Sequence, residues 1–77
     1  MLMSSPAVER YLERHGLNNP NIRKFSSLEE VKANLDTITF EECHRVNVLY
    51  GITFELNQGV IVDAYQDAIP EGELLLD

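Results

Sequence analysis

The sequence contains no tryptophan, one cysteine and no apolar run near the ~18 residues that a membrane-spanning helix requires. A single cysteine cannot form an internal disulfide, which excludes the cross-links that stabilise many small secreted domains. The N-terminal residues also lack the basic and apolar regions of a secretory signal. We therefore expect a complete small protein of the reducing cytoplasm that makes no contact with membranes.

Basic residues are scarce, with six Lys and Arg against thirteen Asp and Glu, for a net charge of −7. Nucleic acids and anionic membranes attract basic surfaces, so this balance argues against direct binding to either. The bases are absent from residues 46–77, which carry six acids, whereas residues 1–45 hold seven acids and all six bases. This asymmetry indicates either a solvated face that keeps the protein soluble or an acidic surface that meets a basic partner.

The length of 77 residues allows one small domain with a modest hydrophobic core. We expect residues 1–4 to be disordered and residues 66–77 to form a loop followed by an acidic leucine tail. Within that tail, consecutive leucines should dock on the domain or face a partner, because burying each is worth roughly 1.5–3 kcal/mol.

The first half of the chain carries signals for short helices. Ser5 and Pro6 suit the start of a helix over residues 6–15, and Gly16 suits its left-handed end. Ser27 and Glu30 predict a capping box at the start of a second helix that ends near residue 36. A further capping signature over residues 39–42 predicts one or two more helical turns, reaching residue 44.

After residue 44 the pattern changes to the alternation of apolar and polar residues that is typical of a strand, over residues 46–56. Gly51 interrupts it and indicates a bend or bulge. Residues 57–59 fit a three-residue hairpin loop. This register predicts three apolar cross-strand pairs on one face: Leu56 with Val60, Phe54 with Val62, and Ile52 with Ala64.

A helix through residues 53–68 is the alternative, because several of its apolar residues also cluster on a helical wheel. Gly59 and the run of β-branched residues that follows it disfavour that helix. The predicted fold class is therefore α+β, with two or three short N-terminal helices packed on a C-terminal antiparallel hairpin or small meander. A small all-α bundle is the alternative.

Reactive residues are few and do not form a recognised catalytic or metal-binding motif. Cys43 and His44 are adjacent, and neighbours in a helix or strand point in different directions, which disfavours a nucleophile–base pair. The histidines, Cys43 and the acids lack the spacings of zinc sites. We therefore predict no enzymatic activity, no cofactor and no metal.

These observations predict a small acidic regulator or inhibitor that binds another protein with a basic surface through its C-terminal half. The candidate partner-binding residues are Tyr50, Glu55, Asp63, Tyr65, Asp67, Leu74, Leu75 and Leu76. One alternative is a structural, dimerising subunit of a larger complex, and another is an inhibitor that mimics nucleic acid. A homodimer is expected because a small sheet leaves exposed edges.

Overall fold

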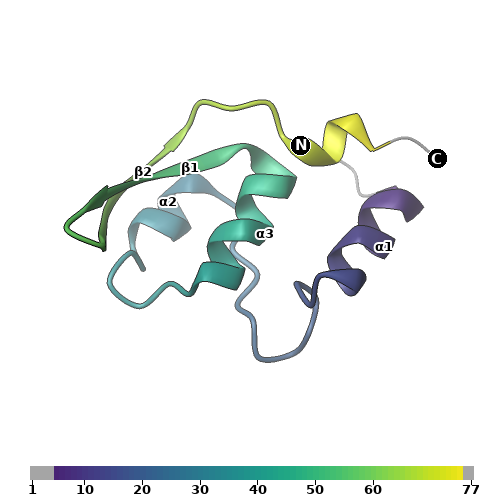
Figure 1. The fold of residues 1–77 in the computed structure, drawn as a ribbon, viewed down its shortest axis with the longest axis horizontal. Helices are drawn as coiled ribbons and strands as arrows, with labels where there is room; N and C mark the ends of the chain where they lie inside the picture. The colour runs from purple at the N-terminus through teal and green to yellow at the C-terminus, as the bar shows by residue number, and fades with distance from the viewer. Residues whose placement is uncertain (1–4, 76–77) are drawn as a thin grey trace.

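The computed structural model describes residues 5–75 of the chain, and the predictions for residues 1–4, 76 and 77 lie outside that range. Its elements are, in chain order, α1 (Pro6–Arg14), α2 (Leu28–Lys32), α3 (Phe40–Tyr50), β1 (Ile52–Asn57), β2 (Val60–Gln66) and a 3₁₀ helix, η1 (Glu71–Leu74). Three helices precede an antiparallel two-stranded hairpin (Figure 1). The α+β prediction is confirmed, and the all-α alternative is wrong.

Helix α1 has the ends that its sequence predicts. The Ser5 hydroxyl accepts a hydrogen bond from the backbone N–H of Val8 at 3.2 Å. At the other end Gly16 adopts φ +71°, and the N–H of Leu17 donates to the carbonyl of Leu12 at 2.7 Å. This backbone arrangement is a Schellman motif, which ends the helix and directs Leu17 into the core.

Helix α2 is shorter than predicted, because it ends at Lys32 and is followed by turns rather than by helix to residue 36. Ser27 caps its start, since the Ser27 hydroxyl accepts from the N–H of Glu30 at 3.1 Å. The second hydrogen bond of the predicted capping box, in which the Glu30 carboxylate accepts from a backbone N–H at the cap, is displaced by one residue. The carboxylate of Glu30 accepts from the backbone N–H of Ser26 at 2.7 Å, not from that of Ser27.

Helix α3 is longer than predicted, and the expected strand over residues 46–50 is wrong. A full capping box between Thr39 and Glu42 starts the helix, which continues to Tyr50 and ends at Gly51 with φ +70°. Its buried side chains include Val46 and Leu49, which lie on the face of Glu42. Leu49 breaks the strand alternation and would face solvent in a strand, whereas the helical spacing buries it beside Val46. The strong N-terminal cap also favours the helix.

The hairpin forms where it is predicted, but its loop and register differ. Gln58 and Gly59 both have positive φ, so the connection is a two-residue turn of type I′ rather than a three-residue loop. A bulge then leaves Val62 unpaired. The observed partners on the core-facing side are Leu56 with Ile61, Phe54 with Ala64, and Ile52 with Gln66, so all three predicted pairs are wrong.

The predicted loop over residues 66–72 also needs correction, because β2 includes Gln66 and η1 begins at Glu71. The intervening segment returns along α3. The N–H of Ala68 donates to the carbonyl of Gly51 at 3.1 Å, and η1 packs against α3.

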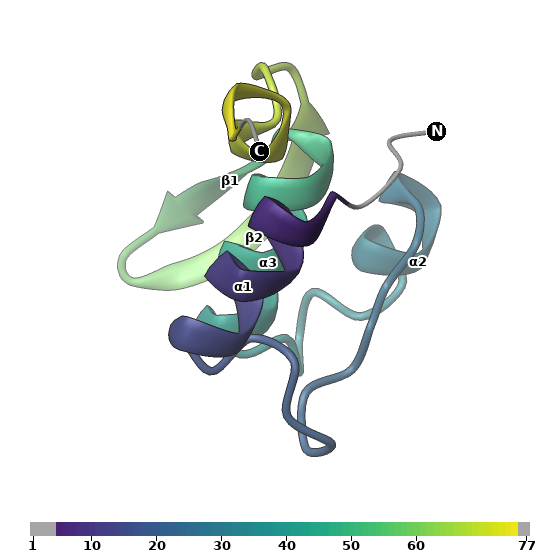
Figure 2. The same ribbon diagram turned by 90° about the vertical axis from the view of Figure 1, so that its right-hand side faces the viewer.

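Two groups of buried side chains form the core. The first joins α1 to α3 through Val8, Leu12, Leu17, Val48 and Leu49. The second joins α2, α3 and the hairpin through Phe25, Val31, Val46, Ile52 and Ala64. Figure 2 shows α1 lying along α3 on the side away from α2. Helix α3 therefore holds the two halves of the molecule together.

Among residues 5–75, none of the helices combines the length and the apolarity that crossing a membrane requires.

Candidate functional site

The outward side of the hairpin carries four of the predicted partner-binding residues. We call this surface, formed by Glu55, Asp63, Tyr65 and Asp67, the acidic face. Glu55 and Asp63 are directly opposed across the two strands. The hydroxyl of Tyr65 donates to the carboxylate of Glu55, and Asp67 accepts from the hydroxyl of Thr53 at 2.7 Å. The structure thus brings together residues that the sequence separates by up to twelve positions.

Hydrogen bonds and a nearby charge affect the pKa values of two residues of the acidic face, Asp63 and Tyr65. The backbone N–H of Ala64 donates to Asp63 and lowers the pKa of that carboxyl, with a smaller effect from Lys32 at 3.6 Å. The hydrogen bond to Glu55 raises the pKa of Tyr65 to about 12, so this phenol stays protonated and donates at neutral pH. The acidic face therefore presents three carboxylates at fixed positions beside a neutral aromatic ring.

Tyr50 does not belong to the acidic face. It is the last residue of α3, is half-buried and packs against both groups of core side chains. Its backbone carbonyl accepts from the side-chain amide of Gln66 at 3.2 Å. Its place in the structure indicates a structural contribution to packing.

The described part of the leucine tail begins in η1, at the end of the molecule away from the hairpin tip (Figure 1). Leu75 is half-buried and packs against the core side chains of α1 and α3, whereas Leu74 is 69% exposed. Leu76 is outside the described residues. The structure therefore separates the predicted leucine anchors from the acidic face.

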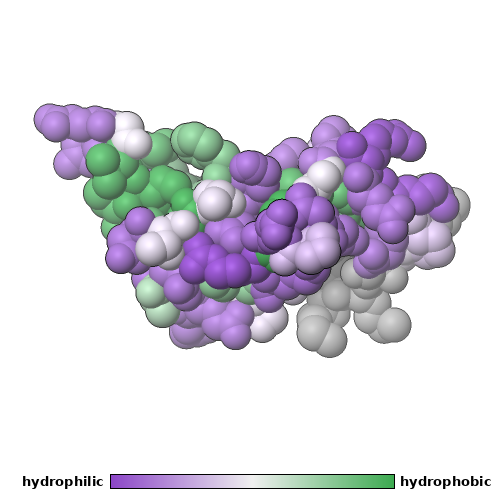
Figure 3. All heavy atoms as spheres, turned by 90° about the horizontal axis from the view of Figure 1, so that it is seen from below, coloured by the Kyte–Doolittle hydropathy of each residue, from purple (hydrophilic) through white to green (hydrophobic). Residues whose placement is uncertain are grey.

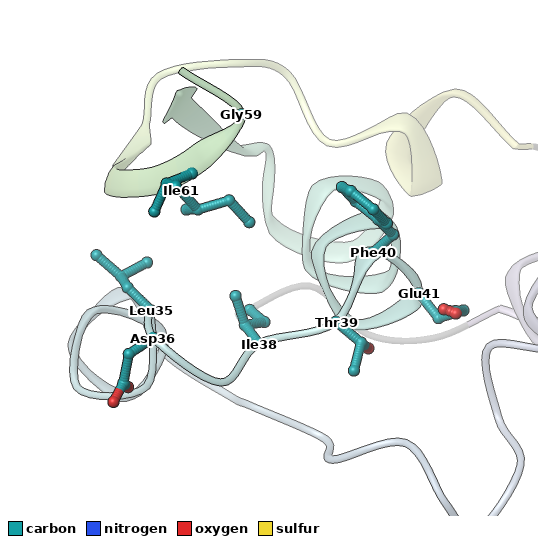
Figure 4. A pocket seen from close by; sticks show the side chains of 9 residues that line it. Leu35, Asp36, Ile38, Thr39, Phe40, Glu41, Gly59 and Ile61 are labelled. Atoms are coloured by element: carbon teal, nitrogen blue, oxygen red, sulfur yellow. The ribbon is translucent and has the colours of Figure 1, made fainter. Parts of the chain in front are cut away.

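A second surface, which the sequence does not predict as a site, is an apolar groove between the hairpin tip and the segment that joins α2 to α3. The hollow has a volume of about 410 Å³. Its apolar walls are Leu35, Ile38, Phe40, Val60 and Ile61 (Figure 4). Apolar side chains gather on the surface at this end of the molecule (Figure 3).

Charge at the groove is of one sign, because Asp36 and Glu41 also line it and no lining residue is basic. Lys32, one turn before Asp36 in sequence, extends toward Asp63 at the edge of the hairpin. The groove is thus apolar in its walls, and the carboxylates of Asp36 and Glu41 point away from the hollow toward its surroundings (Figure 4).

One sequence signal points to this groove. Val60, Ile61 and Val62 are consecutive, and successive side chains of a strand point to opposite faces, so a hairpin cannot bury all three. The bulge at Val62 directs Ile61 toward the core-facing side and leaves Val60 62% exposed.

The reactive side chains lie on α3 and on or just after α1, and none of them lines the groove or belongs to the acidic face. Burial raises the pKa of the Cys43 thiol to about 11, with a smaller effect from Glu42. His44 lies 3.3 Å from the hydroxyl of Tyr11, and the ring of His15 stacks on Tyr11 with centroids 4.1 Å apart. Within residues 5–75 no three metal-ligating side chains converge on a point where an ion would bind.

Comparison of the chain with known protein families, with curated proteins and with solved structures finds no match. The functional interpretation therefore depends on the two surfaces themselves.

Proposed function

We propose that this protein is a small, non-enzymatic regulator or inhibitor that binds a basic protein through the acidic face of its hairpin. The observation that carries the proposal is the direct opposition of Glu55 and Asp63. Like charges opposite each other destabilise a sheet, and this pair supplies no contact that the core uses. Lys32 offsets part of this repulsion at Asp63, at 3.6 Å, and a basic partner would offset the rest.

Charge placement supports the same function. The acidic face carries three carboxylates on a rigid hairpin, and Tyr65 adds an aromatic side chain of the kind enriched at the centres of interfaces. Complementary charge mainly speeds association and selects the partner, whereas buried anchors supply most of the affinity. The acidic face is therefore suited to steering a partner onto neighbouring apolar surface.

Capture from a cell extract, followed by mass spectrometry, tests this function. The bait is the wild-type chain, and the test variant is Glu55→Gln with Asp67→Asn, because both amides retain hydrogen-bond acceptors for Tyr65 and Thr53. The matched control is Glu9→Gln with Glu13→Gln, which removes the same charge from α1. We expect one dominant basic protein with the wild type and control, and a strong loss with the test variant. Equal capture by all three baits would refute the proposal.

A structural subunit that dimerises is the second candidate, and the exposure of Leu74 favours it. In that case the exposed leucine would pack against a second copy, while the acidity would only maintain solubility. Sedimentation of the wild type and of Leu74→Gln distinguishes the two. A concentration-dependent dimer that the substitution abolishes favours the subunit, and a monomer in both favours the regulator.

A further inference from the structure

We infer that the apolar groove binds a short segment of another protein that combines large apolar side chains with flanking Lys or Arg residues. This inference rests on the proposed protein-binding function and names a second contact surface for it. Ile61 lines the groove from the core-facing side of the hairpin, whereas Glu55 and Asp63 of the acidic face point to the other side of the strands.

Exposed apolar side chains at the groove are the first observation. Phe40 is 78% exposed at the first position of α3, where the capping box of Thr39 and Glu42 already stabilises the helix start. Val60 is 62% exposed and Leu56 is 57% exposed at the hairpin tip. Single exposed apolar residues are ordinary, but Phe40 and Val60 line one hollow, which is typical of an interaction site.

The extent of the apolar surface favours a peptide segment over a small molecule. The hollow of about 410 Å³ is within the range of ligand sites. The exposed side chain of Leu56, the cross-strand partner of Ile61, adds apolar surface next to the hollow. A segment with two or more apolar anchors covers both the hollow and this added surface.

Charge complementarity identifies the flanks of that segment as basic. Asp36 and Glu41 belong to the lining, their carboxylates point out of the hollow, and no lining residue is basic (Figure 4). Lys or Arg residues that flank the apolar anchors and extend beyond the hollow would therefore meet opposite charge. A second copy of this chain, seated groove to groove, would instead bring the same acids of both copies together. Each copy also carries a net charge of −7, so the groove favours a basic partner over a second copy of this chain.

Selection from a library of random peptides displayed on phage tests the inference on the full chain. The test variant is Phe40→Gln with Val60→Thr. Both side chains are exposed, so circular dichroism and the melting temperature should change little. The matched control is Val62→Thr, which alters the same strand two residues away at a position that does not line the groove.

We expect the wild type to enrich peptides with apolar anchors flanked by Lys or Arg. Synthetic copies of these peptides should bind the test variant at least about tenfold more weakly and bind the control as they bind the wild type. Asp36→Asn with Glu41→Gln should reduce the preference for basic flanks. Failure to enrich any peptide, enrichment of acidic peptides, or equal binding to the test variant would overturn the inference. A concentration-dependent dimer that the test variant abolishes would also overturn it, because the occupant would then be a second copy.

The two proposals fail in different ways. Loss of the acidic face through Glu55→Gln and Asp67→Asn leaves the groove intact, so the selected peptides should still bind that variant. If the selected peptides bind this variant while capture of a basic protein is the same with and without the acidic face, the inference about the groove stands and the proposed function of the acidic face is wrong.

Discussion

Glu42 is the residue at which sequence, packing and charge are most closely linked. Its side chain is 2% exposed, and its carboxylate accepts from the N–H of Thr39 at 3.0 Å and from the N–H of Arg23 at 2.7 Å. The guanidinium of Arg23 adds contacts of 3.0 and 3.1 Å. One carboxylate thus caps α3 and fixes the segment that leads from α1 to α2.

The hydrogen bond from Arg23 is the main cause that lowers the pKa of Glu42 to about 2, against its usual value of 4.5. Because the folded-state pKa is depressed, the stabilisation is complete above about pH 4.5 and is lost as the pH falls toward 2. Glu42→Gln should lower the free energy of unfolding by about 3 kcal/mol at neutral pH, since it leaves Arg23 without its charged partner.

Urea unfolding of the wild type and Glu42→Gln in steps from neutral pH down to about pH 2 measures this effect. The difference between the two proteins should shrink as the pH falls through that window. Glu41→Gln, at the exposed neighbouring position, is the control and should cost little at any pH. A difference that stays constant with pH would contradict this assignment.

Cys43 provides a second prediction at the residue scale. With its pKa raised to about 11 by burial, roughly one thiol in 10⁴ is ionised at neutral pH. Iodoacetamide should therefore alkylate the folded protein at least about a hundredfold more slowly than the urea-unfolded chain. Rapid and selective labelling of the native protein would contradict this and would favour a nucleophilic cysteine.

At the scale of elements, the join between α3 and β1 depends on Gly51. This residue adopts φ +70°, and a Cβ atom there would lie 2.0 Å from the carbonyl oxygen of Ala68. Gly16 ends α1 with almost the same φ, +71°, but a Cβ atom there would have open space around it. The two glycines therefore share a backbone conformation and differ in their surroundings.

Gly16→Ala should lower the free energy of unfolding by about 1 kcal/mol, because it adds only the backbone strain of a non-glycine residue at positive φ. Gly51→Ala should cost clearly more, because the segment after β2 must also move away from α3. Urea unfolding of both variants beside the wild type measures the two costs. Equal losses would show that the contact with Ala68 contributes nothing.

The elements also show how far the sequence predicts this fold. Caps at Ser5 and Thr39 are local signals, so the starts of α1 and α3 are predicted to the residue. The end of α3 is not, because residues 46–50 follow the strand period at every position but Leu49. Packing against α1, which buries Val48, decides in favour of the helix, and this contact between distant segments has no local signal.

For the candidate site, the sequence again predicts one part of the hairpin correctly and another part incorrectly. The strand alternation puts Glu55 and Asp63 on the same side of the hairpin, but the bulge changes the register, so Asp63 rather than Ile61 lies opposite Glu55. The same bulge turns Ile61 toward the groove. The residues of the acidic face were therefore predictable from the sequence, whereas the only signal for the groove was the run of three apolar residues at 60–62.

At the scale of the whole molecule, the described acids of the C-terminal half lie in two places. The three carboxylates of the acidic face lie at the hairpin, whereas Glu71 and Glu73 lie on η1 near α1, whose own acids and bases are equal in number (Figure 1). Helix α3 connects the two groups of core side chains between these places. A partner that approaches the acidic face therefore meets negative charge first, with Ile61 of the apolar groove on the other side of the same strands.

The salt dependence of the association rate tests the central proposal most directly, with the captured partner and the chain mixed at increasing ionic strength. The wild type and the control, Glu9→Gln with Glu13→Gln, should associate quickly at low salt and slow steeply as salt is added. The variant Glu55→Gln with Asp67→Asn should associate more slowly and respond less to salt. The same rate and the same salt dependence in all three proteins would contradict a steering function for the acidic face.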